Sequence, residues 1–298
     1  MNTNYSLIIP YYNNPRLLLR LLSTVPRRHD LQVIVVDDFS DRGIDDFNNI
    51  KSQFYWIEWY RTSENRGGGH ARNLGLEKAS GNWIIFADCD DFFLPSFNLL
   101  LDLYSTNISE DIIFFDAISV DSESYKISKR NNHLSKMIDG CKNNVSKAEL
   151  SLRYLFGEPW GKIIKRQLIM KHNIRFDETR IHNDTKFSYM IGFYAKNIKI
   201  EDLAVYCITE RSQSVSKLIN LDKLIIRIKI FAEKNKFLSD HHIKVFDPIL
   251  LGPFNMTLKS LDFKLFNKIL KTYNSLGYSF FKLLKLNFYK KVGLKIQN

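Results

Sequence analysis

Three aspartates stand close together directly after a short apolar run, and they are the most distinctive group in the chain. Asp88, Asp90 and Asp91 follow residues 83–87, which read Trp-Ile-Ile-Phe-Ala. Carboxylates at this density repel one another unless a cation lies among them, and their oxygens suit Mg²⁺ or Mn²⁺. An ion held here would bind a diphosphate and stabilise it as a leaving group. The alternative is a solvated acidic loop that caps a helix beginning near Pro95.

Five short apolar runs alternate with segments of helical patterning, and this rhythm indicates how the aspartates are positioned. The apolar runs are residues 5–10, 31–38, 56–60, 83–87 and 111–115, and the helical segments are residues 15–25, 45–54, 70–79 and 95–104. Such alternation predicts βαβ units around a mostly parallel sheet, so the fold class is α/β. In these sheets ligands bind at the carboxyl ends of the strands.

Distinctive residues follow three of the expected strands at those ends. The first strand is followed by Tyr12, the second ends in Asp37 and Asp38, and the fourth is followed by the aspartate cluster. We therefore expect these side chains to meet in one crevice. For Asp37 the alternative is a helix cap.

The rest of the chain predicts a large first domain and a helical second one. The 298 residues are 45% hydrophobic, which is enough for a large core. Residues 121–147 are polar and predict a surface loop or an excursion toward a substrate that would accept the group released from the diphosphate. Residues 203–208 predict one more strand. From residue 221 the pattern is helical, apolar and basic. We place the domains at 1–217 and 218–298.

The net charge of +11 lies in the second half of the chain. Residues 151–298 carry 27 Lys and Arg against 12 Asp and Glu. An excess of this kind suggests an anionic partner, either nucleic acid or an acidic membrane surface. Residues 271–298 contain lysines interleaved with Phe, Leu and Tyr and no acidic residue. They predict a basic amphipathic helix at a membrane surface, and the alternative is a terminal helix packed on the core with a solvated lysine face.

The cysteines and histidines add no further chemistry. Cys89, Cys141 and Cys207 are too few and too scattered for a disulfide framework or a zinc site, so we expect free thiols. The seven histidines show no ligand spacing and are expected at the surface or in packing. No run of about 18 apolar residues predicts a membrane span.

Five segments in order resemble the family 2 (GT-A fold) inverting glycosyltransferases of bacterial polysaccharide, O-antigen and capsule synthesis. They are residues 6–13, 35–40, 65–75, 87–91 and 160–184. Each segment is a weak signal alone, but their order and spacing together are specific. The resemblance implies a GT-A, Rossmann-like fold with a C-terminal helical extension.

The resemblance assigns four residues to the nucleotide sugar. Pro10 and Tyr12 would line the nucleotide pocket, with Tyr12 packing on the base. Asp38 would accept a hydrogen bond from a uracil N–H, and Arg72 would approach the nucleotide or its diphosphate. The alternative for Arg72 is a surface ion pair on its helix.

The resemblance also assigns residues to the metal and the diphosphate. Asp88 would reach the ribose and the metal, and Asp90 would bind the metal, Mn²⁺ or Mg²⁺, directly. Arg211, with Ser214 and Ser216, resembles a loop that folds over the diphosphate, and an arginine fork fits phosphate oxygens well. The alternative is an ordinary connecting loop.

An inverting transfer also needs a carboxylate that takes the proton from the acceptor hydroxyl. In the family this base is the Asp of a Glu-Asp pair that follows Trp-Gly-Lys and Phe-Asp-Glu segments. Here the two segments are residues 160–162 and 176–178, and the pair reads Asn183-Asp184. The resemblance makes Asp184 the base and leaves the consequence of Asn183 open. The alternative is that Asp184 caps the following helix, a role compatible with catalysis.

The expected function is transfer of a hexose or N-acetylhexosamine from a UDP-sugar to a glycan acceptor, which we expect to be lipid-linked. We expect a cytoplasmic protein, peripheral on the inner face of the cytoplasmic membrane, with no nucleic-acid partner. The alternatives are another nucleotide-dependent transferase, such as a nucleotidyltransferase, and a nucleic-acid-binding protein that uses the basic half.

Overall fold

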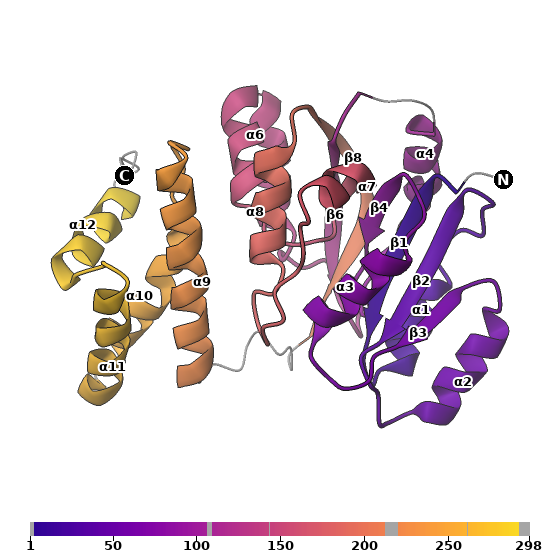
Figure 1. Ribbon diagram of the computed structural model, residues 1–298, viewed down its shortest axis with the longest axis horizontal. Helices are drawn as coiled ribbons and strands as arrows, with labels where there is room; N and C mark the ends of the chain where they lie inside the picture. Colours follow the sequence, from indigo (N-terminus) through magenta and orange to yellow (C-terminus); the bar gives the residue numbers. More distant parts are fainter. Residues whose placement is uncertain (1–2, 106–108, 143, 212–219, 261, 292–298) are drawn as a thin grey trace. The chain divides into compact units, whose positions relative to one another are not determined.

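The chain forms two compact units, Met1–Ser212 and Gln213–Asn298 (Figure 1). The computed structural model describes residues 3–105, 109–142, 144–211, 220–260 and 262–291. The expected domain boundary at 217/218 lies outside these residues. Within them, no helix combines the length and the apolar character that crossing a bilayer requires.

The first unit is built on a single sheet, whose eight strands in the described residues have the order β3-β2-β1-β4-β7-β6-β8-β5. The strands are β1 (Tyr5–Tyr11), β2 (Leu31–Asp37), β3 (Glu58–Arg61), β4 (Trp83–Phe86), β5 (Phe92–Phe93), β6 (Ile112–Asp121), β7 (Lys162–Lys165) and β8 (Ile198–Glu210). Only β5 and β7 run against the other six. The expected α/β class with a mostly parallel sheet is confirmed.

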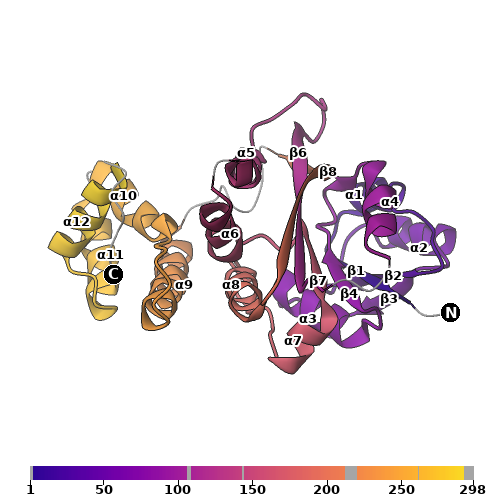
Figure 2. The same cartoon turned by 90° about the horizontal axis from the view of Figure 1, so that it is seen from above.

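The strand order reverses beside β1. The chain passes from β1 outward to β2 and β3, and then returns to β4 on the other side of β1. Right-handed crossovers therefore place α1 (Pro15–Leu22) and α2 (Ile44–Gln53) on one face of the sheet and α3 (Gly68–Lys78) on the other (Figure 2). A reversal of this kind opens a crevice at the carboxyl ends of the two strands, which here are β1 and β4.

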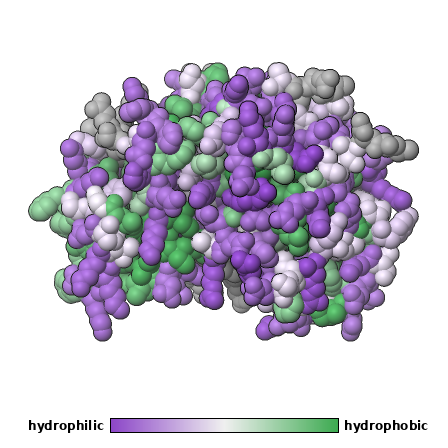
Figure 3. All heavy atoms as spheres, in the orientation of Figure 1, coloured by the Kyte–Doolittle hydropathy of each residue, from purple (hydrophilic) through white to green (hydrophobic). Residues whose placement is uncertain are grey.

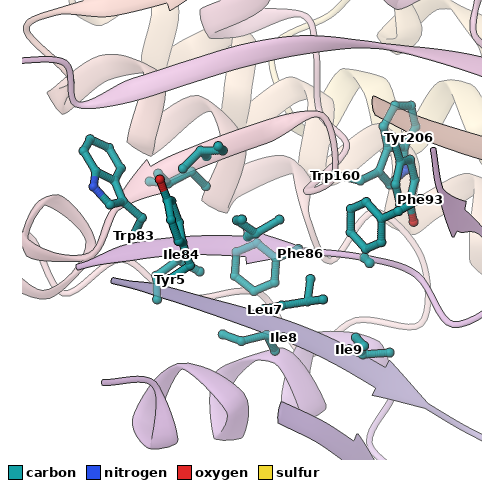
Figure 4. Close-up of a cluster of buried hydrophobic side chains, with 14 of the residues drawn as sticks. Tyr5, Leu7, Ile8, Ile9, Trp83, Ile84, Phe86, Phe93, Trp160 and Tyr206 are labelled. Carbon is teal, nitrogen blue, oxygen red and sulfur yellow. The ribbon is translucent and has the colours of Figure 1, made fainter. Parts of the chain in front are cut away.

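The central strands are apolar runs because both of their faces are buried in the core. Both faces of β1 and β4 are covered, and every residue of these two strands is buried. Figure 4 shows Leu7, Ile8 and Phe86 at the centre of this cluster. Helix α3 approaches closely because Gly75 lies against Ile8, where a Cβ would stand 2.4 Å from the isoleucine Cγ2.

Residues 121–147 form the surface loop that their polarity predicts only as far as residue 131. Strand β6 runs to Asp121, and α5 (Asn132–Asp139), the short 3-10 helix η1 (Gly140–Lys142) and the start of α6 (Val145–Tyr154) follow. Helix α5 buries Leu134, Met137 and Ile138, spaced three and four residues apart. The loop prediction was wrong from residue 132 on, because these three apolar residues stand among many polar ones. The other helices of the first unit are α4 (Ser96–Leu103), α7 (Arg166–Lys171) and α8 (Thr185–Tyr194).

The second unit is helical, as the sequence predicts, and has its own core. Its elements are α9 (Leu221–Asp240), the 3-10 helix η3 (Pro248–Leu251), α10 (Gly252–Lys259), α11 (Phe263–Ser275) and α12 (Phe280–Lys291). Ile228, Phe254, Tyr273 and Leu283 lie at its centre.

Candidate active site

The aspartate cluster lies at the carboxyl end of β4, beside the reversal in strand order. One carboxylate oxygen from each of Asp88, Asp90 and Asp91 lies within 4.8 Å of the others. Asp91 is buried, and the other two are half-buried. This oxygen-only set fits a hard divalent cation. The helix-cap alternative is wrong, because α4 begins after Pro95 without any side-chain cap.

Strand β8 holds the cluster in place. The Thr209 backbone amide donates to the Asp91 carboxylate at 2.7 Å, and its hydroxyl donates to the Asp90 carbonyl at 2.6 Å. The Asp88 amide donates to the Tyr206 hydroxyl at 2.9 Å. Burial, with the nearby charges of Asp90 and Asp88, raises the pKa of Asp91 well above its usual range. Asp91 therefore serves to anchor the loop.

Sequence reasoning missed Tyr206 and Thr209, because they lie 118 residues from the aspartates that they hold. No motif marks them. Figure 4 shows Tyr206 beside Trp160, with the two rings stacked at 5.8 Å. The expected strand at 203–208 is part of β8, so the element was predicted and its contact was not.

Two arginines contact the carboxylates of the aspartates. Arg72 donates to Asp88 at 2.5 Å and to Asn183 at 3.0 Å, and Arg211 forms an ion pair with Asp90. Arg72 is only 7% exposed, so the alternative of a surface ion pair is wrong. In the part of the chain that the structure describes, the second carboxylate oxygens of Asp88 and Asp90 accept no hydrogen bond. These two oxygens are therefore suited to bind a cation. Ser214 and Ser216 lie outside the described residues.

Asp184 lies at the start of α8, but its carboxylate makes no capping hydrogen bond. The capping alternative is therefore wrong for the side chain. Burial raises the pKa of Asp184 to about 6; the positive charge of Arg72 opposes this rise, and the carboxylates of Glu158 and Asp88 add to it. The carboxylate thus lies within electrostatic reach of the Arg72–Asp88 pair.

The segment before Asp184 is fixed to α3. The Asn73 side chain makes two hydrogen bonds with the Phe176 backbone, at 2.9 and 3.0 Å. Gly69 lies so close to the Asp177 carbonyl that a Cβ would stand 2.1 Å from its oxygen. The glycine-rich segment therefore serves to let this backbone approach α3.

Lys162 of the Trp-Gly-Lys segment connects α8 to the backbone of residues 156–158. Its buried ammonium donates to the Phe156 and Glu158 carbonyls at 3.0 and 2.7 Å, and to the Ser188 hydroxyl at 3.1 Å. Ser188 lies one helical turn after Asp184. Lys162 therefore positions α8.

The nucleotide-pocket residues predicted on β1 and β2 lie at the neighbouring strand ends. Tyr12 is 46% exposed, whereas Pro10 is buried within β1. The buried Asp38 carboxylate accepts from the backbone amides of Gly67 and Arg66, at 2.7 and 3.3 Å, so it holds the start of α3. Asp37 accepts from the Ser40 amide at 2.9 Å. It caps no helix, because α2 begins after Gly43.

The model of the family described as glycosyl transferase family 2 matches residues 6–172, more than half of the chain. The chain belongs to glycosyl transferase family 2. This family 2 chain is 39% identical over 90 residues to an uncharacterized glycosyltransferase of Haemophilus influenzae, covering 29% of this chain and 36% of that one. It is 27% identical over 224 residues to TarP of Staphylococcus aureus, a poly(ribitol-phosphate) beta-N-acetylglucosaminyltransferase, covering 72% of this chain and 65% of TarP.

The fold is also similar to that of a solved structure. TarS of S. aureus, crystallised as residues 1–349 with UDP-GlcNAc, superposes with a TM-score of 0.65 at 19% identity, covering 92% of this chain and 81% of that one. The expected GT-A fold with C-terminal helices is confirmed. Matches to two further glycosyltransferases cover only 31% and 30% of their lengths, so the chain spans about a third of several curated relatives.

Proposed function

We propose that this chain transfers a hexose or N-acetylhexosamine from a UDP-sugar to an acceptor hydroxyl, with inversion at the anomeric carbon. One observation carries the proposal. The Asp184 carboxylate makes no capping hydrogen bond, has a raised pKa, and lies within electrostatic reach of the Arg72–Asp88 pair. The UDP-sugar is supported by two similar proteins, TarP, named for N-acetylglucosamine transfer, and TarS, solved with UDP-GlcNAc.

Asp88 and Asp90 would hold Mn²⁺ or Mg²⁺ through the oxygens that their arginines leave unpaired. Such a cation supplies positive charge to the departing diphosphate. Arg72 and Arg211, which now face these carboxylates, would turn donors toward the diphosphate oxygens. Tyr12 would pack on the uracil ring, Pro10 would support that wall of the pocket from within β1, and Asp38 would accept from the uracil N–H.

Asp184 would take the proton of the acceptor hydroxyl as its oxygen bonds to the anomeric carbon. The bond from that carbon to the diphosphate oxygen breaks in the same step, and the electron pair leaves with UDP. A carboxylate with a pKa of about 6 suits this role, because it is ionised at neutral pH and more basic than an ordinary aspartate.

The acceptor we propose is a lipid-linked glycan of cell-surface polysaccharide synthesis, such as O-antigen or capsule. Residues 1–217 would carry catalysis, and the basic region 218–298 would keep the enzyme at the inner face of the cytoplasmic membrane. The excess of positive charge in the second half of the chain supports this location. Family membership favours glycosyl transfer over the nucleotidyltransferase and nucleic-acid-binding alternatives.

The test compares the wild type with Asp184→Asn. Calorimetric titration with UDP-GlcNAc, UDP-GalNAc, UDP-glucose and UDP-galactose in Mn²⁺ identifies the donor, and UDP release measures its turnover. We expect Asp184→Asn to bind the donor as the wild type does and to lose turnover. Asp202→Asn, an exposed aspartate on β8, is the matched control and should behave as the wild type. Near-normal turnover by Asp184→Asn, or no binding of any UDP-sugar by the wild type, contradicts the proposal.

A further inference from the structure

Helix α12 carries apolar side chains on two opposite faces. Leu283 and Leu286 are buried in the core of the second unit. Phe281, Leu284 and Phe288 point the other way and are 79%, 40% and 58% exposed. At 100° per residue these three fall within about 60° of one another, opposite the buried pair. We call them the outer stripe.

The inner face already fixes α12 to its unit. Asn287 and Asn255 of α10 exchange side-chain hydrogen bonds, and the Phe280 ring packs on Phe254 at 5.9 Å. The core-packed helix that the sequence left as an alternative is therefore present. Its solvent side, however, is apolar along the outer stripe. Figure 3 shows hydrophobic residues at the surface in the part of the molecule where Figure 1 draws α9 to α12.

Every charged residue of α12 itself is a lysine. Exposed Lys282, Lys285, Lys290 and Lys291 lie on the same helix. Residues 263–291 contain seven lysines and no aspartate or glutamate. The partner that fits this pattern has an apolar interior beneath a negatively charged surface.

The small area of the outer stripe and the charge of its helix favour a membrane over a second copy of the chain as the partner. Two phenylalanines and a leucine exposed to this extent present on the order of 350 Å². A stable dimer buries about 800 Å² per partner, and two copies would bring like-charged helices together. A bilayer surface needs neither a large area nor a complementary protein shape, and its anionic head groups offset the lysines.

We propose that the outer stripe of α12 inserts into the surface of an anionic membrane, with the helix lying in the plane of the interface. Phe281, Leu284 and Phe288 enter the boundary between head groups and acyl chains. Lys285 and Lys291, which flank the stripe at 100° per residue, contact lipid phosphates. The inner face stays on the core, so attachment requires no unfolding of the unit. The inference rests on the proposed function for its biological meaning, since a lipid-linked acceptor lies at such a surface.

The test is flotation of the full chain with vesicles of phosphatidylcholine alone or mixed with phosphatidylglycerol. We expect binding to the mixed vesicles only, and at least tenfold weaker binding for the variant Phe281→Ser/Leu284→Ser/Phe288→Ser. The control is Tyr55→Ser/Ile127→Ser, two residues of the first unit that are 71% and 92% exposed. It should bind as the wild type does. All replaced side chains are exposed, so melting temperatures should agree.

Three results overturn the proposal. They are a wild type that ignores anionic vesicles, a stripe variant that binds them unchanged, and a wild-type dimer that the stripe variant turns into a monomer. Binding of UDP-GlcNAc, UDP-GalNAc, UDP-glucose and UDP-galactose to the wild type with Mn²⁺ is measured in parallel, without vesicles. A wild type that floats with the mixed vesicles but binds none of the four donors contradicts the proposed function alone. A wild type that binds a donor but does not float contradicts the membrane contact alone.

Discussion

Replacing Asp184 by asparagine should make the protein more stable at neutral pH while it removes activity. The folded structure raises the pKa of Asp184 from 3.8 to about 6, chiefly by burial. The folded state thus disfavours the charged carboxylate, and asparagine has nearly the same shape without the charge. The two effects of opposite sign distinguish a catalytic carboxylate from a structural one.

The magnitude follows from the shift in pKa. A difference of about 2 units corresponds to about 3 kcal/mol between the two protonation states. The Asp184 side chain is partly exposed, and solvent screens part of this, so we expect a gain of about 1–2 kcal/mol. For a unit of this size that raises the melting temperature by about 3–5 °C.

The dependence on pH gives the sharper test. Because the folded-state pKa is raised, an aspartate here imposes no penalty below about pH 3, where it is protonated in both the folded and the unfolded state. The penalty grows as the pH rises from the unfolded-state pKa of 3.8 to the folded-state pKa of about 6, and it is complete above that value. The advantage of Asp184→Asn should therefore be largest near pH 8 and should vanish near pH 3.

Thermal unfolding of wild type and variant across this pH range, in EDTA so that no cation contributes, measures the difference directly. Asp202→Asn, which replaces an exposed aspartate, should show no such trend. An Asp184→Asn protein that melts lower than the wild type at pH 8, or a difference that does not change with pH, would show that the fold does not disfavour the charged carboxylate. The carboxylate would then be stabilising, as in an ordinary structural ion pair.

Three more predictions concern the same site. Wild-type turnover should fall below about pH 6 as Asp184 becomes protonated, and a flat profile down to pH 5 would exclude it as the base. Arg72→Lys should weaken UDP-GlcNAc binding about tenfold in titration calorimetry, because a single ammonium cannot replace the bidentate hydrogen bonds of a guanidinium. Unchanged affinity would show that Arg72 does not bind the diphosphate. Gly69→Ala should destabilise the protein by about 1–3 kcal/mol in urea unfolding, because its Cβ would collide with the Asp177 carbonyl. Gly252→Ala has open space and is the control, and equal effects of the two would contradict the close contact.

The predicted strands and their polar ends were visible in the sequence because they depend on neighbouring residues. An apolar run with a carboxylate at its end indicates a buried strand and the edge where it stops. Asp88 at the end of β4 and Asp38 at the end of β2 follow from this pattern alone. The family resemblance added Asp184, which no local pattern distinguishes from a helix cap.

The tertiary structure decided which groups each of these carboxylates meets. Thr209 holds the aspartate loop across 118 residues of sequence, and Arg72 joins Asp88 to Asn183. Asn183 stands where the family usually has a glutamate, and its side chain still accepts a hydrogen bond from Arg72. Only the fold could show that an acceptor is kept there without a second negative charge.

For α12, too, the composition could be predicted from the sequence, whereas the choice of buried residues depends on the fold. Composition alone determined that residues 271–298 are basic, apolar and free of acidic side chains. It could not determine which apolar residues of α12 pack inward, because Leu283 and Phe281 are equally apolar and lie two positions apart. That choice depends on where α10 and α11 stand, since a side chain is buried only when another element covers it.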